Sequence, residues 1–211
     1  MGVHTAGLFI ETGRVAGTLI ADPTVAAMWS EPAVLPGYTV GGLAAHLGRA
    51  VTTVETYLDR DPPGSETPPV EASQYFFAAL KDHDPITSDL HTGIRQRAAV
   101  LAADGPAAVE AHIAETLERL ARHDLSSTRR LAVFDSMAMQ LSEYLKTRIV
   151  ELAVHSSDLA RSVSLAEPAI SEEAWRVVAD VSIGVALLRH GPRLVALGLT
   201  RSDAFPTPKP F

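Results

Sequence analysis

The amino-acid sequence predicts a mainly all-α protein, built as an up-and-down four-helix bundle. Aromatic residues make up only 6% of the 211 residues, whereas alanine and leucine are abundant, and this composition favours helices over sheets. Long segments carry apolar residues at helical spacing, and breaks that contain proline and glycine separate them. Four long helices joined in this way are typical of a bundle.

In the first half of the chain, two bundle helices are expected. The first covers Thr5 to Trp29, with an interruption near Asp22-Pro23. Thr39 is placed to cap the second, which runs to Leu58. The second helix has an apolar stripe made of Val40, Leu43, Leu47, Val51, Val54 and Leu58. The segment from Asp61 to Val70 holds four prolines and a glycine, which predicts a loop.

The second half continues the helical pattern, with helices expected over residues 71–81, 88–103, 106–123 and 142–163. Residues Arg130 to Leu141 alternate weakly, which favours a short hairpin or an extended connection. Helical stretches over residues 171–190 and 194–199 form a C-terminal extension. We therefore expect a single domain over residues 1–211, with the bundle over about 5–165, the C-terminal helical extension over about 171–200 and an irregular tail over 201–211.

Charge and composition exclude several classes of partner. The formal net charge is -7, whereas binding to nucleic acid or to an anionic membrane requires a basic face. The chain has no cysteine, so it offers neither disulfides nor a protein thiol. It also lacks a signal-peptide pattern and an apolar run near the roughly 20 residues that a spanning helix needs. We expect a cytoplasmic protein, monomeric or homodimeric, with no nucleic-acid or membrane partner.

The helix expected over residues 142–163 carries the most informative pattern. One sector is an apolar stripe made of Leu141, Leu145, Ile149, Leu152, Leu159 and Val163. Beside it runs a polar line with spacings of four, three, four, three and four, made of Tyr144, Arg148, Glu151, His155, Asp158 and Ser162. This polar line lies at the edge of the core, where charged groups are costly unless they pair or bind a metal.

Glu151 and His155 are four residues apart, so their side chains can share a metal ion. The alternative is a solvated or salt-bridged pair in which Arg148 neutralises Glu151. The best third ligand is His46, beside the stripe of the second helix; its alternative role is a core-edge histidine with one hydrogen bond. The remaining histidines are interpreted as solvated: His4, His83, His91, His112, His123 and His190.

Two segments resemble a known family. One is Pro-Gly-Tyr-Thr-Val at 36–40 followed by Leu-Ala-Ala-His-Leu at 43–47. The other combines Leu-Ser-Glu-Tyr-Leu at 141–145 with Arg148, Val-Glu-Leu-Ala-Val-His at 150–155 and Asp-Leu-Ala at 158–160. Together they resemble the N-terminal domain of mycothiol-dependent maleylpyruvate isomerases, in the DinB-like superfamily. The resemblance implies a DinB-like four-helix bundle whose metal ligands correspond to His46, Glu151 and His155.

The chain departs from the family pattern at several points. Tyr38 stands where the family usually has tryptophan, and Gly41-Gly42 replaces a charged or polar pair. Longer relatives carry a second, sterol-carrier-like domain, whereas only about forty residues follow the expected bundle here. These departures leave the implied ligands in place and bear on the substrate.

The resemblance also implies a chemistry. It implies a divalent metal, zinc or alternatively nickel, and mycothiol as thiol cosubstrate. The metal-bound thiolate would attack a small electrophile, either isomerising maleylpyruvate by addition, bond rotation and departure, or remaining attached as in an S-transferase. Three protein ligands leave a coordination position open, as in catalytic sites. The alternatives are a metal-dependent hydrolase that uses bound hydroxide and a non-enzymatic metal-binding or interaction bundle.

Three further residues of the polar line are candidates for catalysis or substrate binding. Arg148 has a planar fork that suits a carboxylate of the substrate or the thiol, although an intrahelical pair with Glu151 or Asp158 is the alternative. Asp158, one turn past His155, is placed either to orient that imidazole or to face water. Tyr144 is a candidate donor to a bound anion, or a buried phenol against the core.

Overall fold

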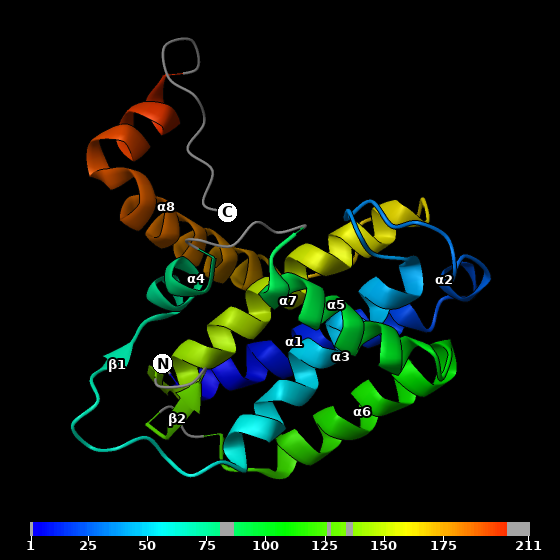
Figure 1. Ribbon diagram of the computed structural model, residues 1–211, viewed down its shortest axis with the longest axis horizontal. Helices are drawn as coiled ribbons and strands as arrows, with labels where there is room; N and C mark the ends of the chain where they lie inside the picture. The colour runs from blue at the N-terminus through cyan, green and yellow to red at the C-terminus, as the bar shows by residue number, and fades with distance from the viewer. Residues whose placement is uncertain (1, 81–86, 126–127, 134–136, 202–211) are drawn as a thin grey trace.

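A computed structural model describes residues 2–80, 87–125, 128–133 and 137–201 (Figure 1). The bundle consists of α1 (Gly2–Ile20), α3 (Val40–Leu58), α6 (Pro106–Arg122) and α7 (Leu141–Ser162). Within the bundle, α1 and α3 each pack mainly against α6 and α7, so the order around it is α1, α6, α3, α7. The predicted mainly helical bundle is confirmed. Helices α1 and α3 lie diagonally opposite each other in the bundle, and so do α6 and α7.

The core forms where the two apolar stripes predicted it. All six stripe residues of α3 and all six residues of the Leu141-to-Val163 stripe are at most 5% exposed. Helix α7 therefore buries one sector against α1 and α3 and leaves its polar line at the boundary with the next layer. None of the helices that the structure describes is long and apolar enough to span a membrane.

The expected break in the first helix is present. Asp22 caps α2 (Pro23–Ala27) by accepting a hydrogen bond from the amide of Thr24 at 2.7 Å, and Pro23 occupies the first turn. Helix α2 ends at Ala27 rather than at the expected Trp29. Thr39 caps α3 as predicted, since its Oγ1 accepts from the amide of Gly42 at 3.0 Å.

Trp29 packs directly on the first turn of α3. A Cβ atom added at Gly41 would lie 2.5 Å from Cε2 of the Trp29 indole, whose Nε1 donates to the carbonyl of Ala102 at 3.0 Å. Because this hydrogen bond fixes the indole, the absence of a side chain at Gly41 is what allows the close approach. This contact accounts for glycine at one of the two positions where the family pattern has larger residues.

We expect Gly41→Ala to destabilise the protein by about 1–3 kcal/mol, because overpacking outweighs the roughly 1 kcal/mol that alanine gains over glycine in a helix. Urea unfolding measures the difference. Gly48→Ala on the same helix is the matched control, since its added Cβ would approach no atom more closely than 3.4 Å. Equal effects of the two substitutions would contradict the packing argument.

Arg119 of α6 and Glu55 of α3 form a two-point ion pair, with distances of 2.6 Å from Nε to Oε1 and 3.0 Å from Nη2 to Oε2. The hydrogen bonds from Arg119 lower the pKa of Glu55, against a smaller opposing effect of burial. A lowered folded-state pKa stabilises the fold at pH values above the unfolded-state pKa, about 4.3, and this stabilisation is lost as pH falls through the folded-state pKa.

We therefore expect Glu55→Gln to melt slightly below the wild type at neutral pH, because the charged hydrogen bonds to Arg119 are lost. In strongly acidic solution the two proteins should melt together. Thermal melting over a pH series measures the difference. A gap between the two melting curves that does not change with pH would show that Glu55 acts through packing instead.

Two further helices cover the bundle. Helix α5 (Asp89–Ala102) packs on α3, and α4 (Ala72–Leu80) packs on α7 and on the C-terminal helix. Both agree with the predicted helices, although Lys81, the expected end of the first, lies outside the described residues. These two helices add a second layer over the polar line of α7, and this layer encloses the site.

A small sheet closes one end of the bundle. The expected extended connection is a hairpin, in which β2 (Arg130–Val133) pairs antiparallel with β3 (Met137–Gln140). A two-residue strand, β1 (Pro69–Val70), pairs parallel with β3. The prediction of a loop throughout Asp61 to Val70 is wrong at this point. Pro69 is tolerated because β1 is an edge strand and a proline there needs no amide hydrogen.

The C-terminal extension is α8 (Glu172–Thr200), which packs on α4 and α7 and then leaves the body of the molecule (Figure 1). Gly191, with φ 77°, interrupts it, and Pro192 begins the next turn, so the two predicted helical stretches are both present. Most of the predicted irregular tail, residues 202–211, lies outside the described residues.

Candidate metal centre

A large cavity lies between α3, α4, α5 and α7, with a volume of about 570 Å³. Its wall is largely apolar, with Phe76, Leu80, Leu90 and Ile94 supplied by α4 and α5. Its polar lining comes from α3 and from the polar line of α7. The sequence pattern alone left open whether this line faces water or the interior; in the structure most of it lines this cavity.

His46, Glu151 and His155 meet in this cavity. Nε2 of His46 lies 3.0 Å from Oε2 of Glu151, and Nε2 of His155 lies 3.7 Å from the same oxygen. The two imidazole rings are 5.0 Å apart between centroids and nearly perpendicular. One potential ligand atom from each residue lies within 4.8 Å of the others. Helix α3 supplies one residue and α7 supplies two, so the packing of these two helices creates the group.

Asp158 supports His155 from the far side of the ring. Its Oδ2 lies 3.1 Å from Nδ1 of His155, one helical turn away, as their spacing predicts. Burial alone would lower the pKa of His155, but the carboxylates of Asp158 and Glu151 outweigh it and raise this pKa. When this imidazole is neutral, donation from Nδ1 leaves Nε2 without a proton and free to bind a metal. This is the usual arrangement around histidines that bind a metal.

The ionisable groups of this site shift one another's pKa values. Burial lowers the pKa of His46 and favours the neutral imidazole, against the hydrogen bond that its Nε2 donates to Glu151, which raises this pKa. Burial alone would raise the pKa of Glu151, but the hydrogen bond from His46 and the nearby positive groups outweigh it and hold this pKa well below its usual range. A carboxylate and a neutral imidazole are the forms that bind metals.

The geometry fits a divalent ion. Ligand atoms arranged tetrahedrally about 2.0–2.2 Å from zinc lie roughly 3.3–3.6 Å from one another, and the two observed separations of 3.0 and 3.7 Å bracket this range. Nδ1 of His46 is buried and has no hydrogen-bond partner among the described residues. Nε2 is the nitrogen that faces Glu151 and would bind the ion, so the buried Nδ1 would need a partner of its own.

A comparison with known protein families covers the part of the chain that holds this group. Residues 11–160 match the family described as the mycothiol maleylpyruvate isomerase N-terminal domain, which is more than half of the chain. The chain belongs to this family. The match spans His46, Glu151 and His155, and the family name connects the chain with the small-molecule thiol mycothiol. No curated protein and no solved structure gives a significant match to the chain.

In this member of the mycothiol maleylpyruvate isomerase N-terminal domain family, Tyr38 lies beside the candidate metal centre. Its ring is 5.6 Å from that of His46, and it lines the cavity. Burial and the negative charge of Glu151 raise the pKa of Tyr38 to about 12, so its hydroxyl stays protonated. A tyrosine at the position usually held by tryptophan therefore keeps an aromatic ring and replaces the indole N–H donor with a hydroxyl that can both donate and accept.

Arg148 and Tyr144 also line the cavity, and both are buried. The alternative of an intrahelical ion pair for Arg148 is not observed: Glu151 pairs with the two histidines, and Asp158 pairs with His155 and Arg161. The guanidinium of Arg148 instead lies 4.9 Å from the centre of the Tyr144 ring, and its Nε donates to Thr147. Burial raises the pKa of Tyr144, so this phenol remains neutral.

Sequence reasoning missed several residues of the cavity, among them three basic side chains. His91 was interpreted as solvated, yet it is partly buried in the lining, with Nδ1 2.8 Å from the hydroxyl of Ser88. Arg49 lies one turn after His46, and the same helical spacing could have placed it in the site. Arg97 belongs to α5 and gave no local signal. Of the other histidines interpreted as solvated, His83 lies outside the described residues.

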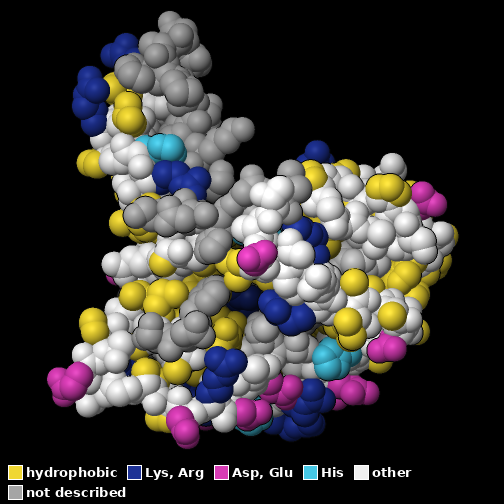
Figure 2. All heavy atoms as spheres, viewed as in Figure 1, with side chains coloured by type: hydrophobic (Ala, Val, Ile, Leu, Met, Phe, Trp, Pro, Cys, Tyr) yellow, Lys and Arg dark blue, Asp and Glu magenta, His cyan; other side chains and the backbone are white. Residues whose placement is uncertain are grey.

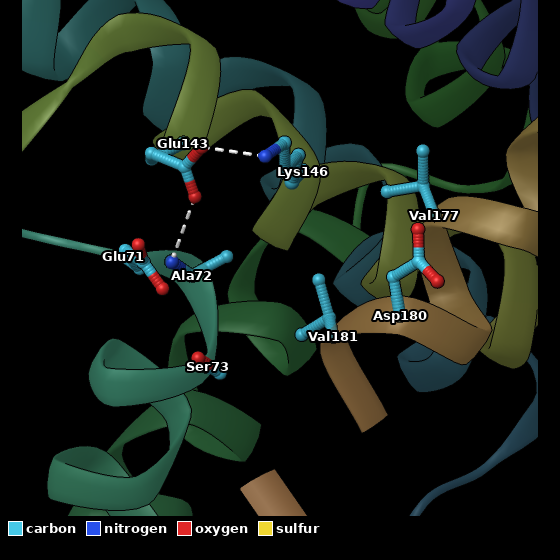
Figure 3. Close-up of a pocket in the computed structure, with 8 residues that line it drawn as sticks. All are labelled: Glu71, Ala72, Ser73, Glu143, Lys146, Val177, Asp180 and Val181. Atoms are coloured by element: carbon cyan, nitrogen blue, oxygen red, sulfur yellow. Dashed lines mark hydrogen bonds and ion pairs between the residues drawn. The ribbon is translucent and has the colours of Figure 1, made fainter. Parts of the chain in front are cut away.

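A second pocket of about 190 Å³ lies where α4, α7 and α8 meet (Figure 3). Glu143 of α7 accepts a hydrogen bond from the amide of Ala72 at 3.1 Å and pairs with Lys146 at 2.5 Å. The carboxylate thus caps the first turn of α4 from a neighbouring helix. We interpret this pocket as a structural joint that holds α4 over the larger cavity.

Proposed function

We propose that this protein is a metal-dependent enzyme that uses a mycothiol-type thiol as cosubstrate, acting either as an isomerase of the maleylpyruvate type or as an S-transferase to a small electrophile. One observation carries the proposal. In a chain of the mycothiol maleylpyruvate isomerase N-terminal domain family, two imidazoles and a carboxylate converge inside a cavity large enough for small organic molecules.

Each residue has a defined task in this proposal. His46, Glu151 and His155 hold a divalent ion, zinc or nickel, and Asp158 orients His155 through its Nδ1. When bound, the ion would lower the pKa of a thiol that coordinates it, so that the thiol reacts as its anion. Tyr144 and Arg148 line the same cavity and hold the electrophile against this centre.

The cavity favours an enzyme over a purely structural site. Among the described residues, only His46, Glu151 and His155 form a group that could hold a metal, and the space beside them is open to a ligand. Structural zinc sites have four protein ligands, whereas catalytic sites keep one position for water or substrate. A net charge of about +1 on two neutral imidazoles, one carboxylate and a divalent ion favours an anionic fourth ligand such as a thiolate.

The test is a turnover assay with the metal-loaded protein, mycothiol and maleylpyruvate, followed by general electrophiles. We expect turnover that requires both metal and thiol and is lost in His46→Ala. Isomerisation returns the thiol unchanged, whereas S-transfer consumes one thiol for each electrophile, so titration of free thiol separates the two reactions. Ester hydrolysis without thiol would support a metal-dependent hydrolase instead and would overturn the proposal.

A further inference from the structure

Three arginines converge on the cavity from three different helices. Arg49 comes from α3, Arg97 from α5 and Arg148 from α7. Arg148 is only 9% exposed, Arg49 is partly buried and Arg97 is exposed at the rim. The molecular face in Figure 2 is hollowed between α4 and α5, and basic side chains lie in and around this hollow beside hydrophobic ones.

None of these three arginines forms an ion pair with a carboxylate that the structure describes, although the negative charge of Glu151 in the same lining attracts Arg148. The ion pairs formed by described carboxylates involve other partners, including the histidines, Arg119, Lys146, Arg161 and Arg176. Nε of Arg49 is buried and has no hydrogen-bond partner among the described residues. Burial and the positive charges of Arg97 and Arg148 lower the pKa of Arg49, which shows that this guanidinium is both desolvated and repelled.

A protein holds like charges together in a partly buried cavity at a cost, and an anion that enters removes the cost. Guanidinium groups bind planar carboxylates through paired hydrogen bonds. The same cavity also has an apolar lining that includes Phe76, Leu80 and Ile94. We propose that Arg49, together with Arg97 and Arg148, forms a carboxylate-binding subsite for an electrophilic substrate that has an apolar body.

The assignment of this carboxylate to the electrophile rests on the proposed function, because it presumes that the thiol occupies the metal. The arginine subsite itself does not need the metal. Its residues line the same cavity, and none of them belongs to the His-Glu-His group. Binding to the arginines can therefore be measured in protein from which metal and chelator have been removed.

The probe pair is 4-phenylbutyrate and its uncharged amide, titrated into the metal-free full chain by calorimetry. We expect the wild type to prefer the carboxylate by about tenfold or more, as charged hydrogen bonds of this kind allow. Arg49→Met should remove this preference while leaving binding of the amide unchanged, and Arg49→Lys should retain part of it. Arg122→Met, an exposed arginine of α6, is the matched control and should behave as the wild type.

Circular dichroism establishes that each variant is folded. Equal binding of acid and amide to the wild type, or an undiminished preference in folded Arg49→Met, would overturn the subsite. In the metal-loaded protein, mycothiol should leave the carboxylate probe bound; displacement of the probe by mycothiol would overturn its assignment to the electrophile. If the carboxylate preference holds while the protein binds no metal, the subsite stands and the proposed function fails, so the two failures are distinguishable.

Discussion

Glu151→Gln is expected to lower the affinity for zinc or nickel by at least about 100-fold and to abolish thiol-dependent turnover. Glu151 is the only anionic member of the His-Glu-His group, and its Oε2 faces both imidazoles at 3.0 and 3.7 Å. Glutamine keeps the size and one oxygen but loses the charge. The loss should exceed the 10–100-fold effects of residues that only support ligands. Calorimetric titration with metal measures the affinity.

The matched control for this substitution is Glu118→Gln, which removes a carboxylate from an exposed position on α6. It should bind metal with the wild-type affinity, because α6 contributes nothing to the cavity lining. If folded Glu151→Gln bound metal as tightly as the wild type, the carboxylate would not be a ligand, and the two histidines would have to act with another group.

Asp158→Ala is expected to lower metal affinity by about 10–100-fold, because the carboxylate fixes the orientation and tautomer of His155 without touching the ion itself. Asp158→Asn should lie between alanine and the wild type, since the amide oxygen can still accept from Nδ1. The same calorimetric titration ranks the three proteins by their metal affinity. A loss of metal affinity of this size, caused by a substitution outside the ligand group, would show that His155 must be held in place.

Arg161→Met is the control for Asp158. Arg161 lies 3.8 Å from Oδ1 of Asp158 and is largely exposed, and such ion pairs contribute little. Metal affinity should therefore be unchanged in this variant. A loss equal to that of Asp158→Ala would mean that the charge network of α7, rather than the hydrogen bond to His155, controls the site.

The helical fold could be predicted because its signals are local. Spacings of three and four residues determine which side chains share a helix face, and both predicted apolar stripes are buried. Capping and breaking residues act over a few positions, which is why Thr39 and the break at Asp22-Pro23 were recognisable. The polar line of α7 was visible for the same reason.

Features that depend on packing between distant segments could not be predicted from local sequence patterns. The diagonal placement of α1 and α3, and the pairing of Pro69–Val70 with β3, follow from contacts between separate parts of the chain. His46 was suggested as the third ligand by its place beside the apolar stripe of the second helix and by the family resemblance, whereas no local spacing indicates its approach to α7. Arg97 reaches the cavity only because α5 packs on α3, and nothing local to residues 89–102 indicates this.

The most direct test of a metal centre at His46, Glu151 and His155 is a measurement of metal stoichiometry. Zinc and nickel are titrated into the metal-free wild type and into His46→Ala and His155→Ala, with elemental analysis of each purified protein. The geometry predicts one divalent ion for each wild-type chain and no stoichiometric binding in either folded variant. A wild type that binds neither metal, or a His46→Ala variant that binds as tightly as the wild type, would contradict the metal centre.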